Sequence, residues 1–97
     1  MTRQQQQDTE CVREVVLANP AGLHARPATV FVDQATKFVS EVVLVKDGRE
    51  ANGKSIMDIL ALGAEQGAQL TLTVRGPDAD AALEALLCLL EGNLEET

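Results

Sequence analysis

The chain has 97 residues, which is enough for one domain with a modest hydrophobic core. Its 15 acidic residues outnumber its 8 basic residues and give a formal net charge of −7, which argues against binding to nucleic acid or to an anionic membrane surface. No apolar run reaches the roughly 18 residues of a membrane span, and the first residues are too polar for a signal peptide. We therefore expect a cytoplasmic protein, and we expect it to be a monomer.

The first ten residues are polar and include a run of glutamines at positions 4–7. They cannot bury apolar surface, so we predict a flexible tail over residues 1–10 and a folded domain over residues 11–97. Residues 12–17 are rich in valine and are typical of a short strand. The Asn-Pro-Ala-Gly segment at residues 19–22 has the composition of a loop.

A helical pattern begins at Ala25. Its apolar residues recur at the spacing of one helix face, and they are Ala28, Phe31, Val32 and Ala35. Pro27 suits the first turn, where a missing backbone N–H costs nothing. The pattern predicts a helix from Ala25 to about Lys37.

The middle of the chain reads as a hairpin followed by a short helix. Residues 42–46 are mostly β-branched, and Asp47-Gly48 is a strong signal for a two-residue hairpin turn. Residues 49–52 would then form the return strand. Ser55 is a good N-cap for a helix from Ile56 to about Leu62, and Gly63 can end that helix.

The last third predicts a strand and a long helix. Leu70, Leu72 and Val74 alternate with polar residues, which is the pattern of a half-buried strand. Residues 78–91 form an amphipathic helical pattern whose apolar stripe consists of Ala79, Leu83, Leu86, Leu87 and Leu90. Cys88 lies in this leucine-rich run, so we predict that it is a small buried hydrophobic residue.

The predicted element order is therefore β-α-β-β-α-β-α. Its simplest packing is a four-stranded, mostly antiparallel sheet with the three helices on one face, an α+β open-faced sandwich. The other sheet face would stay in contact with water, which agrees with the threonines and the glutamine that alternate through the last strand.

His24 is the only histidine in the chain, and it directly precedes the first predicted helix. The unpaired backbone N–H groups and the dipole of a helix N-terminus form an anion site, and the Arg26 guanidinium can grip phosphate oxygens. A lone loop histidine is more often simply solvated. A metal site is poorly supported because there is no second histidine, and we expect neither a metal nor a cofactor.

Two motifs decide between these interpretations. The run Gly22-Leu23-His24-Ala25-Arg26-Pro27-Ala28, followed by Gly53-Lys54-Ser55-Ile56-Met57, resembles HPr, the family of histidine-containing phosphocarrier proteins of the bacterial phosphotransferase system. The resemblance extends from about Val12 to the C-terminus. It implies the open-faced sandwich fold described above and a carrier that acts stoichiometrically rather than as an enzyme.

The resemblance also implies roles for individual residues. His24 would accept a phosphoryl group on Nδ1 from phosphoenolpyruvate by way of Enzyme I and pass it to an EIIA-type protein. Arg26 would assist, and the backbone N–H groups of Ala25 and Arg26 would bind the phosphate. Ser55 would be the regulatory serine that an HPr kinase/phosphorylase modifies. The docking patch for partners would consist of Thr29, Ile56, Met57 and Leu60.

A second hypothesis is a regulatory interaction module. Such a protein would be a paralogue of the nitrogen-related branch, or a protein that a transcription regulator reads through phosphate on Ser55. A carrier would form an acid-labile adduct on His24, whereas a purely regulatory module would carry only acid-stable phosphate on Ser55. The presence of both His24 and Arg26 favours the carrier.

Overall fold

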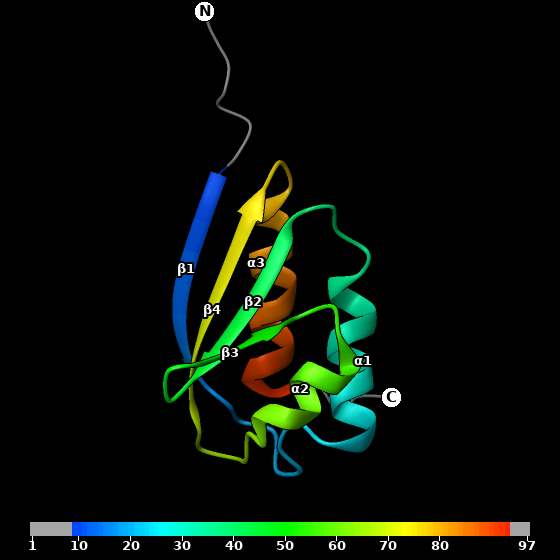
Figure 1. Ribbon diagram of the computed structural model, residues 1–97, viewed down its shortest axis with the longest axis vertical. Helices are drawn as coiled ribbons and strands as arrows, with labels where there is room; N and C mark the ends of the chain where they lie inside the picture. The colour runs from blue at the N-terminus through cyan, green and yellow to red at the C-terminus, as the bar shows by residue number, and fades with distance from the viewer. Residues whose placement is uncertain (1–8, 94–97) are drawn as a thin grey trace, which may run out of the picture.

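The computed structural model describes residues 9–93, which form one sheet covered on one face by helices (Figure 1). The sheet has the strand order β1-β4-β2-β3, and its neighbouring strands are antiparallel. The strands are β1 (Thr9–Val16), β2 (Glu41–Lys46), β3 (Arg49–Asn52) and β4 (Gln69–Gly76). The helices are α1 (Ala25–Ala35), α2 (Ile56–Leu62) and α3 (Ala79–Cys88). The predicted fold class and element order are confirmed.

The hairpin between β2 and β3 turns at the predicted residues. Asp47 and Gly48 have φ values of 52° and 77°, and two successive positive φ values are the mark of a type I′ turn. The turn sets Lys46 opposite Arg49 and Leu44 opposite Ala51. Leu44 and Ala51 are buried, so this register directs the apolar residues of both strands toward the helices.

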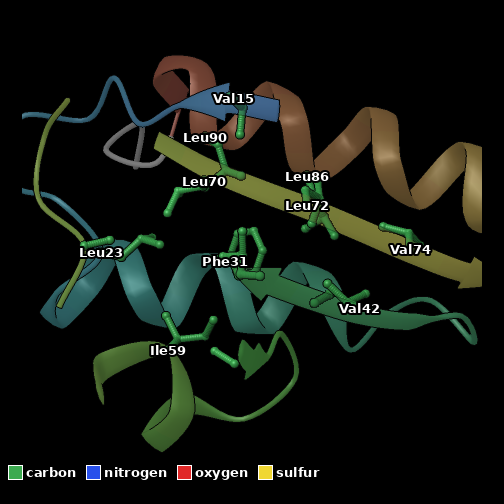
Figure 2. Close-up of a cluster of buried hydrophobic side chains, with 14 of the residues drawn as sticks. Val15, Leu23, Phe31, Val42, Ile59, Leu70, Leu72, Val74, Leu86 and Leu90 are labelled. Atoms are coloured by element: carbon green, nitrogen blue, oxygen red, sulfur yellow. The ribbon is translucent and has the colours of Figure 1, made fainter. Parts of the chain in front are cut away.

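The core lies between the sheet and the three helices (Figure 2). Phe31 of α1 is its largest side chain and is fully buried. Since the chain has only two aromatic residues, aliphatic side chains fill most of this space. The core residues labelled in Figure 2 are Val15, Leu23, Phe31, Val42, Ile59, Leu70, Leu72, Val74, Leu86 and Leu90.

The N-terminal strand is longer than the sequence pattern predicts. Thr9 and Glu10 belong to the predicted tail, yet both lie in β1, where they pair with Gly76 and Arg75 of β4. The length of β4 provides these partners, and a local pattern cannot reveal them. The other residues of the predicted tail, 1–8, lie outside the described residues.

The prediction that Cys88 is buried is wrong, because Cys88 is exposed at the end of α3. Leu86 and Leu90 lie two residues to either side of it and are both buried. A step of two residues turns a helix by about 200°, so Cys88 faces away from the core that its neighbours contact. A short segment, Leu89–Asn93, follows α3 and contains Gly92 in a non-helical conformation with φ 143°. Within residues 9–93, no helix combines the length and apolar character needed to cross a membrane.

Candidate functional site

His24 is the N-cap residue of α1. Its backbone is extended, with φ −127° and ψ 156°, and its side chain makes no capping hydrogen bond. The imidazole is 40% exposed. The ring is therefore available to a partner while its backbone is fixed at the first turn of a helix.

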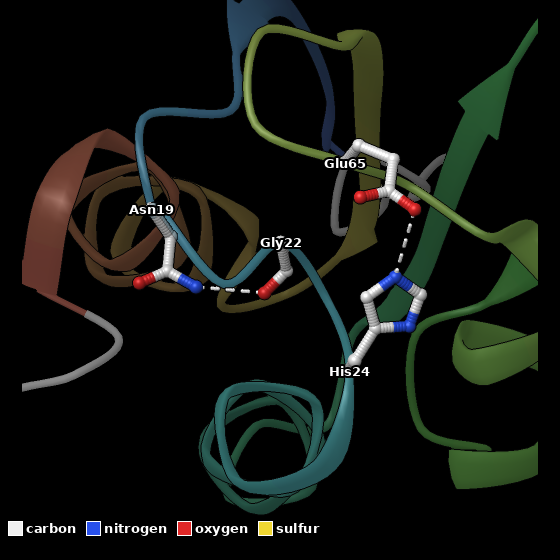
Figure 3. Close-up of polar contacts among 4 residues, drawn as sticks. All are labelled: Asn19, Gly22, His24 and Glu65. Atoms are coloured by element: carbon white, nitrogen blue, oxygen red, sulfur yellow. Dashed lines mark hydrogen bonds and ion pairs between the residues drawn. The ribbon is translucent and has the colours of Figure 1, made fainter.

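The loop before His24 is held by hydrogen bonds across the turn that leads into α1. The backbone N–H of Gly22 donates to the carbonyl of Asn19 over 3.0 Å, and Asn19 Nδ2 donates back to the carbonyl of Gly22 over 2.7 Å (Figure 3). Gly22 has φ +71°, a conformation that glycine adopts without strain. Asn19 is 1% exposed, so this contact is internal to the loop. Asn19 was not among the predicted site residues, although an asparagine at the start of a turn is a known signal for side-chain bonding to the backbone.

The first turn of α1 supplies donors next to His24. Ala25 and Arg26 are its first two residues, and their N–H groups precede the first hydrogen bond of the helix. Pro27 follows and has no N–H. The first turn contains no acidic residue, so nothing in it offsets the positive end of the helix dipole. The predicted anion-binding donors thus directly follow His24 in the chain, at the first turn of α1.

Ala25 has an unusual backbone conformation. Its φ is 50°, in the left-handed region that residues with a Cβ atom rarely adopt. Thr29, one turn further along the helix, is exposed and donates from Oγ1 to the Ala25 carbonyl over 3.2 Å. Ala25, with this strained backbone, stands in the chain between His24 and Arg26, and Arg26 is exposed.

A carboxylate that the sequence did not predict as part of the site, that of Glu65, lies beside the imidazole. Its Oε2 is 3.4 Å from His24 Nε2, and Figure 3 shows the carboxylate and the ring pointing toward each other. The two residues are 41 positions apart. No motif connects them, and only the packing of the two loops brings them together.

Ser55 is the N-cap of α2, as predicted, and Gly63 ends this helix in the left-handed conformation. Ser55 Oγ accepts a hydrogen bond from the backbone N–H of Asp58 over 3.3 Å. The Asp58 carboxylate in turn accepts from the N–H of Asn52 over 3.0 Å. Ser55 is half-buried, and its hydroxyl is committed to the local fold at the start of α2.

The residues of the predicted docking patch differ in exposure. Met57 is 71% exposed and Leu60 is 39% exposed. Ile56 is half-buried and packs against the core, whereas Thr29 on α1 is exposed. Ile59 and Leu62 provide the buried face of α2. Since α1 and α2 pack against each other, the patch spans neighbouring helices.

The fold and the site together define a class of protein. It is a small open-faced sandwich that presents one imidazole at a helix N-terminus, a place where backbone donors can hold an anion on the ring. Among residues 9–93, no group of three or more histidine, cysteine, aspartate or glutamate side chains could hold a metal ion.

Comparisons with known proteins give the same class. A family model described as the PTS HPr component phosphorylation site matches residues 11–92. Phosphocarrier protein HPr of Treponema pallidum is 45% identical over 85 residues, which are 88% of this chain and 97% of that protein. HPr-like protein Crh of Halalkalibacterium halodurans is 40% identical over 79 residues, which are 81% of this chain and 94% of that protein.

A solved structure agrees with the sequence matches. The crystal structure of phosphocarrier protein HPr from Bacillus anthracis is similar to this chain with a TM-score of 0.82 and 40% sequence identity, and the similarity covers 84% of this chain and 96% of that one. The chain belongs to the HPr family of phosphocarrier proteins.

Proposed function

We propose that this chain is a cytoplasmic phosphocarrier that accepts a phosphoryl group on His24 from phospho-Enzyme I and passes it to an EIIA-type protein. The observation that carries the proposal is the position of His24, an exposed imidazole that caps α1 without using its side chain for capping. The family supports the same role, because its model is named for a phosphorylation site and covers residues 11–92.

The residues around His24 suit the transfer. A neutral ring nitrogen has a lone pair that can attack phosphorus, and the N–H groups of Ala25 and Arg26 can receive the negative oxygens that arrive with it. The Arg26 guanidinium adds a permanent positive charge to the same turn. The product is a charged group held at an exposed helix end, where a second protein can take it.

The test is phosphoryl transfer from radiolabelled phosphoenolpyruvate through purified Enzyme I. Wild-type protein should acquire one acid-labile label and lose it when an EIIA-type protein is added. His24→Gln should acquire none, and its circular dichroism spectrum should match that of the wild type. Labelling of His24→Gln to the wild-type level would refute the proposal, as would a wild type that stays unlabelled.

We also propose that Ser55 is a regulatory phosphorylation site for an HPr kinase/phosphorylase, and that a transcription regulator reads the modified form. The Gly53-Lys54-Ser55-Ile56-Met57 run carries the resemblance, and the serine adjoins the exposed Met57 of the docking patch. A phosphate there would add about two negative charges next to the surface that partners would contact. Incubation with the kinase and ATP should give acid-stable phosphate in the wild type and none in Ser55→Ala.

A further inference from the structure

The loop between α2 and β4 is bound to the loop that carries His24. The backbone N–H of Leu23 donates to the Ala64 carbonyl over 2.9 Å. The two backbones are so close that a Cβ atom on Gly22 would lie 2.5 Å from the Ala64 oxygen and 3.1 Å from the Glu65 Cα. Packed backbone therefore places residue 65 beside His24, and the Glu65 side chain, which is 77% exposed, reaches the ring from the surface.

The Glu65 carboxylate contacts only one of the two nitrogens of the His24 ring. Glu65 Oε2 lies 3.4 Å from His24 Nε2, and in Figure 3 Nδ1 lies on the side of the ring away from the carboxylate. An ionised carboxylate can only accept hydrogen bonds, so a hydrogen bond between these two atoms needs a proton on Nε2. In a neutral imidazole, Nδ1 then carries the lone pair.

We propose that Glu65 is a positioning residue for His24, which selects the tautomer with hydrogen on Nε2 and holds the ring so that Nδ1 can attack phosphorus. This inference rests on the proposed function of His24. During transfer, the Nδ1 lone pair forms the new bond to phosphorus while the bond from phosphorus to the donor breaks, and the donor keeps that electron pair. No proton leaves the ring. The positive charge that develops on the imidazole is shared with Nε2–H, which faces the Glu65 carboxylate.

Two variants of Glu65 and one control separate this role from a general charge effect. Glu65→Gln and Glu65→Ala remove the charge beside the ring. Glu50→Gln removes one charge from an exposed residue of β3, on the opposite edge of the sheet from β1. All three variants have the same net charge, and their folding can be compared by amide NMR spectra.

The first measurement is the tautomer of His24 in the unphosphorylated protein, read from the ¹⁵N chemical shifts of the ring at a pH where the ring is neutral. The spectrum is simple because His24 is the only histidine. In the wild type and Glu50→Gln, the tautomer with hydrogen on Nε2 should predominate more strongly than in either Glu65 variant. An equal tautomer ratio in all four proteins would overturn the proposal.

The second measurement is the initial rate of labelling by Enzyme I and phosphoenolpyruvate. Both Glu65 variants should be slower than Glu50→Gln by about two- to fivefold, the range that a partly exposed charge contact supports. A rate equal to or above that of Glu50→Gln would show that Glu65 acts only as a repulsive charge, and this would overturn the proposal. If wild type accepts no label, the proposed function fails, and the tautomer measurement still decides the role of Glu65.

Discussion

Ser40 and Asp78 bind each other through hydrogen bonds that run in opposite directions. The Ser40 hydroxyl donates to Asp78 Oδ1, and the backbone N–H of Asp78 donates to Ser40 Oγ over 3.2 Å. The same carboxylate accepts the N–H groups of Ser40 and Val39, each over 2.9 Å. Asp78 is the N-cap of α3, yet its side chain makes no capping bond there, because it ties α3 to the segment before β2.

This cluster predicts a dependence of stability on pH. The hydroxyl of Ser40, followed by the N–H of Val39, holds the pKa of the Asp78 carboxyl below its usual value of about 3.9. A carboxyl whose pKa is lower in the folded state stabilises the fold above its unfolded pKa, and this stabilisation is lost as the pH falls through the folded value. Asp78→Asn should therefore show a shallower loss of unfolding free energy between about pH 5 and pH 2 than the wild type.

Urea unfolding at a series of pH values measures that slope. Glu84→Gln changes the net charge by the same amount from an exposed position on the same helix, so it serves as the control. Equal slopes in Asp78→Asn and the wild type would contradict the prediction.

The left-handed backbone of Ala25 predicts an unusual response to glycine. The left-handed conformation costs a residue with a Cβ atom about 1–2 kcal/mol, while glycine costs about 0.4–1 kcal/mol through the freedom of the unfolded chain. With φ at 50°, Ala25→Gly should leave the free energy of unfolding unchanged or raise it by up to about 1.5 kcal/mol. Ala81→Gly, at an exposed position inside α3, should lower it by about 1 kcal/mol.

The two alanine variants can be compared by urea unfolding under the same conditions. A loss of stability in Ala25→Gly as large as that in Ala81→Gly would mean that Ala25 is not strained in solution.

The capping role of Ser55 predicts different outcomes for two substitutions. Ser55→Ala removes the oxygen that accepts from the Asp58 N–H and should lower the free energy of unfolding by about 1 kcal/mol. Ser55→Asp keeps a capping oxygen, so it should be more stable than Ser55→Ala. The added charge of Ser55→Asp should also slow labelling by Enzyme I relative to Ser55→Ala, if the docking patch receives that partner.

Urea unfolding and the labelling assay measure these two effects separately. Equal stability of Ser55→Ala and the wild type would exclude a capping contribution. Equal labelling rates in the alanine and aspartate variants would argue against regulation by charge at this residue.

The sequence predicts those parts of the molecule that local chemistry determines. The Asp47-Gly48 turn needs two residues that tolerate positive φ, and α2 has a capping serine and a terminal glycine, so the position of the turn and the extent of the helix could both be predicted. The first two residues of β1 could not be predicted, because β4 provides their pairing partners from far along the chain.

The same distinction holds at the candidate site. His24, Arg26 and Ser55 lie in two motifs that resemble those of the HPr family, and this resemblance, more than residue chemistry alone, allowed their roles to be proposed. Glu65 could not, because it approaches His24 only through the contact between the Leu23 and Ala64 backbones. The positive φ of Ala25 could not be predicted from the sequence either, because alanine is among the best helix formers and gives no local sign of strain.

The exposed and buried faces of α2 predict that substitutions on the first affect partner binding and substitutions on the second affect stability. Met57 is 71% exposed, so Met57→Ala should change the free energy of unfolding by no more than about 0.5 kcal/mol. If the docking patch meets Enzyme I, the same change should weaken that complex by about 1–2 kcal/mol, as truncation of an apolar anchor does. Ile59→Ala, on the fully buried face of the same helix, should instead cost about 2–5 kcal/mol of stability.

A second exposed apolar residue gives the matched control for binding. Val39 is 76% exposed and follows the C-terminal end of α1, the end opposite His24. Val39→Ala should leave the affinity for Enzyme I, measured by calorimetry, at the wild-type value. If Met57→Ala and Val39→Ala bind equally well, the exposed side chain of Met57 does not contribute to docking, and the contact surface must lie on other residues around His24.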